Sequence, residues 1–213
     1  MKACIFDLDG VIVDTAKYHY LAWKRLAAEL GIDLTEEVNE RLKGVSRMES
    51  LDIILNLKGL TMSTREKEEL ADKKNAWFVE YINAMKPDEI FEGAKELIQR
   101  IRDHKIKIGL ASSSKNAKAV LKLLGIQSLF DVVIDGTMIQ HTKPHPEIFL
   151  KASSALGLTP DECIVIEDAE AGIESAVRAG MKCVGIGSAK QLHKANLVVP
   201  SISELKFDKL NNL

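Results

Sequence analysis

The chain has few of the residue types that mark secreted, membrane or nucleic-acid-binding proteins. It holds three cysteines in 213 residues, an odd and small number that argues against a disulfide framework and against cysteines as zinc ligands. Aromatic residues make up 5% of the chain, and no apolar run is long enough to cross a bilayer. The formal net charge of -2 gives no basic surface for nucleic acid or for an anionic membrane.

These absences narrow the setting in which the protein works. Cys4, Cys163 and Cys183 each stand at the head of an apolar run, which favours buried, reduced thiols and a reducing compartment. The N-terminal apolar run is too short for a signal peptide. We therefore predict a cytoplasmic protein with neither nucleic acid nor membrane as a partner. Because no long exposed apolar stripe is visible, we also predict a monomer.

Hydrophobic periodicity predicts an α/β fold with one inserted segment. The chain is long for one domain and 46% hydrophobic, enough for a core domain with an insertion. Residues 16–83 have helical spacing, with capping sequences at Ser46–Glu49 and Ser63–Glu66. From Pro87 onward helices alternate with continuous apolar strands, which is typical of a doubly wound parallel sheet. The predicted strands after the first are 106–111, 132–134, 163–166 and 183–186.

The stretch Ile5–Thr15 delivers two carboxylates, Asp7 and Asp9, after a short apolar run. On a strand the two side chains would point to the same side, since side chains alternate with period two. Burying two neighbouring anions is costly unless a cation or a proton offsets their repulsion, so the pair indicates a metal site. Alternatively, Asp9 and Gly10 form only a turn. An EF-hand is excluded because the glycine comes too early and Tyr18 stands in place of the closing Glu.

Three later strands also end in polar residues. Ser112, Lys143 and the pair Glu167–Asp168 follow them, and the carboxyl ends of parallel strands meet at one edge of a sheet. A carboxylate that attacks phosphorus needs a cation beside it and donors for the phosphoryl oxygens. Each segment alone has a simpler explanation: a helix cap for Ser112 or for the acidic pair, and a solvated loop for Lys143. Together and in this order they favour a site for phosphoryl transfer.

The four segments resemble the four motifs of the haloacid dehalogenase superfamily, and the resemblance spans essentially the whole chain. It implies a Rossmann-like core at residues 1–14 and 84–213 with an inserted four-helix cap at 15–83, and Mg2+ as cofactor. It implies Asp7 as nucleophile, Asp9 as general acid/base, and Ser112 and Lys143 as phosphoryl binders. The implied metal ligands are Asp7, Asp9, Glu167 and Asp168.

Three further stretches, 14–19, 42–47 and 111–116, resemble the beta-phosphoglucomutases within this superfamily. The resemblance implies that Arg47 grips the phosphate that is not transferred, for which a guanidinium fork is suited. It places Thr15 at a hinge and gives His19 the role of holding Asp9 inactive until substrate binds. Without the resemblance, Arg47 would be expected as an exposed residue in the first turn of a capped helix, and His19 and Lys74 on a solvated helix face. The other implied substrate-binding residues are Lys43, Gly44, Val45, Ser46, Lys74, Asn75, Ser113, Ser114, Lys115 and Asn116.

The resemblance therefore implies an isomerase that interconverts beta-D-glucose 1-phosphate and glucose 6-phosphate. Its intermediates would be an aspartyl phosphate on Asp7 and glucose 1,6-bisphosphate, which also serves as the activating phosphoryl donor. One alternative is a sugar-phosphate phosphatase that uses the same residues, with Asp9 activating water. A second alternative is a sugar-phosphate sensor without catalysis, against which the intact Asp7 and Asp9 argue.

Overall fold

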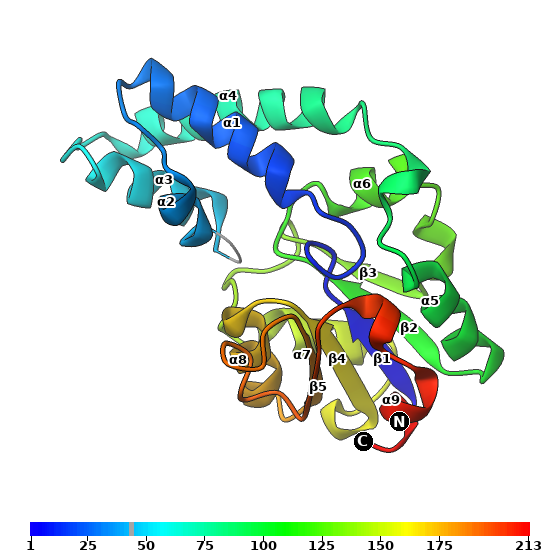
Figure 1. Cartoon of the computed structure of the whole chain (residues 1–213). Coiled ribbons are helices and arrows are strands. Elements are labelled where there is room, and N and C mark those ends of the chain that lie inside the picture. The colour runs from blue at the N-terminus through cyan, green and yellow to red at the C-terminus, as the bar shows by residue number, and fades with distance from the viewer. Residues whose placement is uncertain (43–44) are drawn as a thin grey trace. The chain divides into compact units, whose positions relative to one another are not determined.

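The computed structural model describes residues 1–42 and 45–213, which divide into two compact units (Figure 1). The first, here called the core unit, comprises Met1–Asp14 and Lys86–Leu213. The second, the helical unit, is Thr15–Met85. Among the helices of the described residues, none combines the length and the apolar character that a membrane span requires.

The core unit is built on a six-stranded parallel sheet in the order β3-β2-β1-β4-β5-β6. The doubly wound parallel sheet predicted from the sequence is confirmed. Strand order reverses at β1, which pairs with β2 on one side and β4 on the other, so the ligand-binding switch point lies at its carboxyl end. The strands are β1 (Ala3–Phe6), β2 (Lys107–Ala111), β3 (Val132–Ile134), β4 (Cys163–Glu167), β5 (Lys182–Ile186) and β6 (Leu197–Val199).

Helices of the core unit bury the sheet, which explains the continuous apolar strands. All four residues of β1 are fully buried, and Phe149 of α7 and Ile173 of α8 pack in one apolar cluster with this strand. The three cysteines are buried free thiols, as predicted. The helices of this unit are α5 (Ala94–Asp103), α6 (Ala117–Leu123), α7 (Glu147–Ala155), α8 (Glu170–Arg178) and α9 (Phe207–Asn211). Short 3-10 turns cover η1 (Pro87–Glu89), η2 (Gln127–Leu129), η3 (Pro160–Glu162) and η4 (Ile202–Glu204).

One detail of the first motif differs from the sequence prediction. Strand β1 ends at Phe6, so the placement of Asp7 and Asp9 on a strand is wrong. Asp7 continues the ladder by one bond, since its N–H donates to Ile166 O at 2.9 Å. The chain then turns at Gly10, which has φ +75° and donates its N–H to Val13 O. The two carboxylates are therefore brought together by this loop and not by strand alternation.

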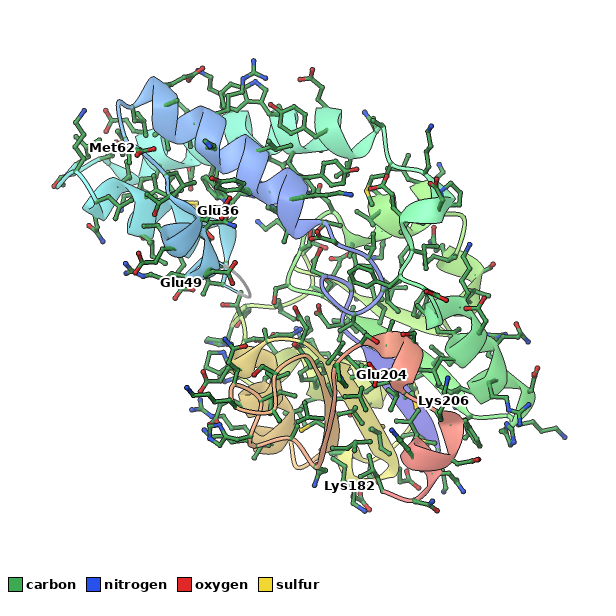
Figure 2. All side chains as sticks on the ribbon, viewed as in Figure 1. Glu36, Glu49, Met62, Lys182, Glu204 and Lys206 are labelled. Atoms are coloured by element: carbon green, nitrogen blue, oxygen red, sulfur yellow. The ribbon has the colours of Figure 1, made fainter. Side chains whose placement is uncertain are left out.

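The helical unit contains α1 (Ala16–Glu29), α2 (Glu36–Glu40), α3 (Arg47–Asn56) and α4 (Thr64–Ile82). The sequence predicted α1 from its periodicity and α3 and α4 from their capping sequences, whereas α2 was not predicted as a separate helix. Its apolar core includes Trp23 and Leu26 of α1 with Leu51 and Ile54 of α3. The predicted capping box at the start of α4 is present, whereas at the start of α3 the Ser46 side chain accepts from Glu49 N at 3.2 Å. Figure 2 shows Glu36 and Glu49 in the helical unit; both lie in the first turns of their helices, where the helix dipole favours negative charge.

Candidate active site

A buried lysine joins the carboxyl ends of three strands in the core unit. Lys143 Nζ lies 2.5 Å from Asp7 Oδ1 and 2.5 Å from Glu167 Oε1, and it donates to Ala111 O at 3.3 Å. These partners follow β1, end β4 and end β2, so the sheet edge positions all of them. Lys143 is only 4% exposed, which excludes the solvated loop considered from the sequence. Its peptide bond to Pro144 is cis.

The cluster carries more negative than positive charge. Burial, together with the nearby Glu167 carboxylate, raises the pKa of Asp7 to about 6, although Lys143 acts in the opposite direction. Burial and the charge of Asp7 raise the pKa of Asp9 to about 8. Burial and the charges of Glu167 and Asp7 raise the pKa of Asp168 to about 9. Burial lowers the pKa of Lys143, but the two carboxylates outweigh it and hold this pKa above its ordinary value. The single positive charge of Lys143 therefore does not balance the carboxyl groups of the cluster.

The donors of this cluster fit a magnesium ion. All are carboxylate oxygens, the ligands that a hard divalent cation prefers. Two glycines leave room for them: a Cβ on Gly10 would lie 1.9 Å from Asp168 Oδ2, and one on Gly172 would lie 1.8 Å from Glu167 Oε1. Both oxygens of Glu167 already accept, one from Lys143 and one from Ala169 N at 2.8 Å. These two bonds fix the Glu167 carboxylate near that of Asp7, which contacts the same lysine.

The loop after β2 offers hydroxyl and amide groups next to Asp7. Phe6 pairs with Leu110, so the residues that follow these strands run side by side. Ser112 is fully buried, and its Oγ accepts from Ser114 N at 3.1 Å. Among the described residues, Ser113 Oγ is a buried oxygen without a hydrogen-bond partner, which is a costly state. Further along the loop, Asn116 N donates to Ser114 Oγ at 3.2 Å, and Lys115 is exposed.

In the helical unit, the buried Lys74 pairs with His19, which is partly exposed. Lys74 Nζ lies 2.6 Å from His19 Nδ1, and the His19 ring stacks on Phe78 with 3.9 Å between ring centroids. Lys74 is 1% exposed, and its Nζ lies 4.5 Å from the centroid of the Trp23 ring. Burial and the charges of Lys74 and Arg47 hold the pKa of His19 well below its ordinary value. The ring is therefore neutral, with Nδ1 accepting from the ammonium, and the solvated helix face is excluded.

Arg47 is the first residue of α3 and is held against α4. Its Nη2 donates to Asn75 Oδ1 at 2.8 Å, and its Nη1 lies 3.7 Å from Asp72 Oδ1. The Arg47 side chain is 20% exposed, and burial lowers its pKa. Half-buried and oriented by Asn75, this guanidinium is not an idle surface group.

The remaining residues predicted for the site are distributed as follows. Thr15 is buried at the N-cap position of α1. Val45 and Ser46 directly precede α3. Lys43 and Gly44 lie outside the described residues. The sequence prediction did not include Gly10 and Gly172. Any side chain at these positions would displace Asp168 or Glu167. The signal that could have identified both glycines is their place in the sequence soon after the carboxylates of the motifs.

Comparisons with known proteins agree with this geometry. A family model described as haloacid dehalogenase-like hydrolase matches residues 1–180. The chain is 44% identical to a beta-phosphoglucomutase of Bacillus subtilis (strain 168), covering 99% of this chain and 94% of the relative. It is 29% identical to a phosphorylated carbohydrates phosphatase of Thermotoga maritima, covering 100% and 98%. A crystal structure of a beta-phosphoglucomutase from Clostridium difficile superposes with a TM-score of 0.97 at 47% identity, covering 100% of this chain and 96% of the other.

Proposed function

Since the chain belongs to the haloacid dehalogenase-like hydrolase family, we propose that it is a beta-phosphoglucomutase that interconverts beta-D-glucose 1-phosphate and glucose 6-phosphate. The observation that carries the chemistry is the buried contact of Lys143 with Asp7 and Glu167. The 44% identity to a mutase over 99% of the chain, against 29% to a phosphatase, favours the mutase.

In this proposal Asp7 is the nucleophile. Its pKa of about 6 leaves the carboxylate largely ionised at neutral pH, and Lys143 reduces its repulsion toward an anionic phosphoryl group. Ser112 and the amides of the loop after β2 donate to the phosphoryl oxygens. Asp7 and Asp168, with Glu167 and Asp9, would hold Mg2+, which would supply positive charge beside the transferred group.

Asp9 then serves as the general acid and base. Burial and the charge of Asp7 raise its pKa, which favours the protonated form that can donate a proton to a leaving sugar oxygen. When a sugar hydroxyl attacks the aspartyl phosphate, the same side chain, now ionised, takes the hydroxyl proton. The raised pKa of Asp9 therefore suits both directions of a reversible transfer.

The full cycle moves one phosphoryl group onto the sugar and another off it. Glucose 1,6-bisphosphate first phosphorylates Asp7, as the activating donor. The 6-hydroxyl of beta-glucose 1-phosphate attacks that phosphorus, its oxygen–phosphorus bond forms, the Asp7–phosphorus bond breaks, and Asp9 accepts the proton. The resulting bisphosphate turns over and returns its 1-phosphoryl group to Asp7, while Asp9 protonates the departing oxygen. Glucose 6-phosphate is released, and the phosphorylated enzyme is regenerated.

We assign the helical unit, Thr15–Met85, the role of a cap with a hinge at Thr15; the sequence analysis placed the end of this cap at residue 83, with the core resuming at 84. Because each turnover holds two phosphates, a second cationic site is needed for the phosphate that is not transferred. Arg47, oriented by Asn75, supports this role, and the Lys74–His19 pair supports a substrate-facing function for that part of the unit. The residues from Lys43 to Ser46 and from Ser113 to Asn116 complete the proposed substrate contacts. A cap also excludes water, which would hydrolyse the aspartyl phosphate.

A phosphatase with the same residues is the second candidate, favoured by the full-length similarity to the Thermotoga maritima phosphatase. In that reaction Asp9 activates water against the aspartyl phosphate. The two candidates share Asp7, Lys143 and the metal ligands, and they differ in whether the second phosphate must be held.

Arg47→Ala separates the two candidates. Removing a guanidinium that makes two charge-assisted bonds to phosphate is expected to lower kcat/KM for the mutase reaction by about 100-fold or more. Hydrolysis of p-nitrophenyl phosphate, which has no second phosphate, should change little. Arg65→Ala is the matched control, since Arg65 is an exposed arginine of the helical unit. Equal mutase activity in Arg47→Ala and Arg65→Ala would contradict the role of Arg47.

The proposed oligomeric state and cellular compartment are those that the sequence analysis predicted. We propose a monomer in the cytoplasm with a sugar phosphate as its small-molecule partner. The three buried free thiols support a reducing compartment.

A further inference from the structure

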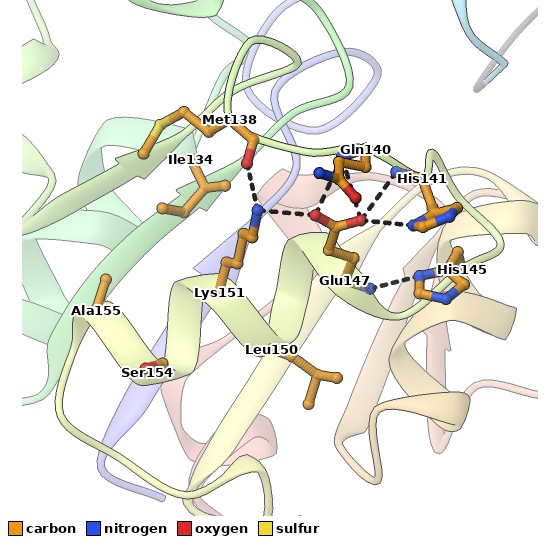
Figure 3. A pocket seen from close by; sticks show the side chains of 10 residues that line it. All are labelled: Ile134, Met138, Gln140, His141, His145, Glu147, Leu150, Lys151, Ser154 and Ala155. Atoms are coloured by element: carbon orange, nitrogen blue, oxygen red, sulfur yellow. Dashed lines mark hydrogen bonds and ion pairs between the residues drawn. The ribbon is translucent and has the colours of Figure 1, made fainter.

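The loop between β3 and α7 places two imidazoles and a carboxylate together in the core unit. His141, His145 and Glu147 each offer a ligand atom, and these atoms all lie within 4.8 Å of one another (Figure 3). Figure 3 shows both imidazoles on the same side of Glu147, opposite Lys151. We propose that these three side chains bind a transition-metal ion of the Zn2+ class. This inference does not depend on the proposed function.

The carboxylate of this cluster is fixed in position without an ion. Glu147 Oε1 accepts from Lys151 Nζ at 2.8 Å and from Gln140 N at 3.0 Å. Its Oε2 accepts from the backbone N–H of His141 at 2.8 Å. Bonds of this kind orient a metal ligand before the ion arrives and reduce the ordering that binding requires.

The spacing of the donors suits a small ion. His141 Nδ1 lies 3.0 Å from Glu147 Oε2, whereas two ligands of a tetrahedral Zn2+ ion with bonds of about 2.0–2.1 Å lie about 3.3 Å apart. The rings of His141 and His145 have centroids 4.5 Å apart. Both histidines are exposed, and His145 Nδ1 accepts from Glu147 N at 3.3 Å, which holds this ring beside the carboxylate. An ion would take the place of the present contact between His141 Nδ1 and Glu147 Oε2.

The donor types determine which metal the site takes. Two imidazoles and one carboxylate favour Zn2+, Ni2+, Co2+ or Cu2+, whereas Mg2+ prefers an all-oxygen set such as the Asp7 cluster. Three protein ligands leave the fourth position of a tetrahedral ion open to water. The two sites of the core unit would therefore select different metals.

An ion at this site would restrain the segment that carries Lys143. This lysine lies two residues from each histidine in the sequence, and Ser175 Oγ already donates to His145 O at 2.8 Å. Metal bonds at positions 141, 145 and 147 would close a short loop around Lys143. Because the unfolded chain lacks the preformed site, binding stabilises the folded protein.

The full-length protein is stripped of metal, placed in saturating Mg2+ and titrated with Zn2+ to test the proposal. Isothermal titration calorimetry should give one Zn2+ per chain, and Zn2+ should raise the thermal midpoint. His141→Ala with His145→Ala should weaken the binding at least about 10-fold and remove the shift in midpoint, because two of three ligands are lost. His193→Ala, which removes an exposed histidine elsewhere in the core unit, should bind as the unmodified chain does.

A spectroscopic readout separates this site from the Asp7 cluster. Co2+ added in the presence of Mg2+ should give visible d–d absorption that the double histidine variant lacks. Because both histidines are exposed, that variant is expected to fold, which circular dichroism checks. The proposal is overturned by zinc binding of equal affinity in the double variant, by zinc binding that Mg2+ abolishes, or by the absence of binding.

Discussion

Replacing Lys143 by Met should destabilise the metal-free core unit strongly. The substitution keeps an unbranched side chain but removes the cation that lies 2.5 Å from both Asp7 and Glu167. Those carboxylates are 6% and 1% exposed, so they cannot regain the lost interaction from water. Breaking a buried ion pair by removing one partner costs about 3–5 kcal/mol, which is a large share of a typical domain stability of about 5–15 kcal/mol.

The loss should depend on pH in a defined direction. Asp7 already has a folded-state pKa of about 6, raised above its unfolded value, and removing Lys143 raises it further. A carboxyl whose folded pKa is raised destabilises the protein above its unfolded pKa, and this penalty disappears as pH falls through the folded pKa. The difference in stability between Lys143→Met and the unmodified chain should therefore be largest near pH 8 and shrink toward pH 5.5.

The assay must report on the core unit. Both tryptophans, Trp23 and Trp77, belong to the helical unit, so tryptophan fluorescence follows the wrong part of the chain. Urea unfolding in EDTA is monitored by the hydrogen exchange of peptides from β1 and β4, which reports on the affected sheet directly. Lys151→Met is the control, because that lysine is 43% exposed in its pair with Glu147 and should matter little. A loss below about 1 kcal/mol for Lys143→Met, or one independent of pH, would refute the reasoning about buried charge.

Three further predictions concern single positions. Gly10→Ala should weaken Mg2+ binding at least about 10-fold in a calorimetric titration, since the new Cβ would lie 1.9 Å from Asp168 Oδ2 at a φ of +75°; unchanged affinity would show that Asp168 does not bind the metal. Ser63→Ala should cost about 1 kcal/mol in unfolding followed by tryptophan fluorescence, because it removes the cap of α4, and a cost near zero would contradict this. His19 is the one histidine of the helical unit by sequence, and its lowered folded-state pKa means that the unfolded chain binds more protons below about pH 6.5. The same fluorescence transition should therefore lose up to about 1.4 kcal/mol per pH unit as pH falls through that window, and a similar slope in His19→Gln would refute the assignment.

The parts of the fold that the sequence predicted are those with strong local patterns. Strands β1, β2, β4 and β5 are apolar runs because helices cover both faces of the sheet, and Ser63 starts α4 through a local cap. Strand β6 and helix α9 were not predicted. They span three and five residues and come after the regular alternation of helix and strand that made the equally short β3 predictable.

The candidate site shows the same division between local and long-range information. The sequence identified Asp7 and Lys143 as separate motifs, but their contact joins residues 136 positions apart and follows from the order of the strands. The pair of Lys74 and His19, 55 positions apart, likewise depends on the packing of α1 against α4. The cluster of His141, His145 and Glu147 became visible only when the loop conformation was known.

The most direct test of the account measures how much of the phosphate ends in glucose 6-phosphate and how much is released as free phosphate. The purified protein is given Mg2+, beta-glucose 1-phosphate and a trace of glucose 1,6-bisphosphate, and glucose 6-phosphate and free phosphate are followed in parallel. Asp7→Asn serves as the inactive control, because it lacks the nucleophile. The account predicts that glucose 6-phosphate accumulates with little free phosphate. Release of free phosphate in place of glucose 6-phosphate would leave the Asp7 chemistry intact and contradict the mutase.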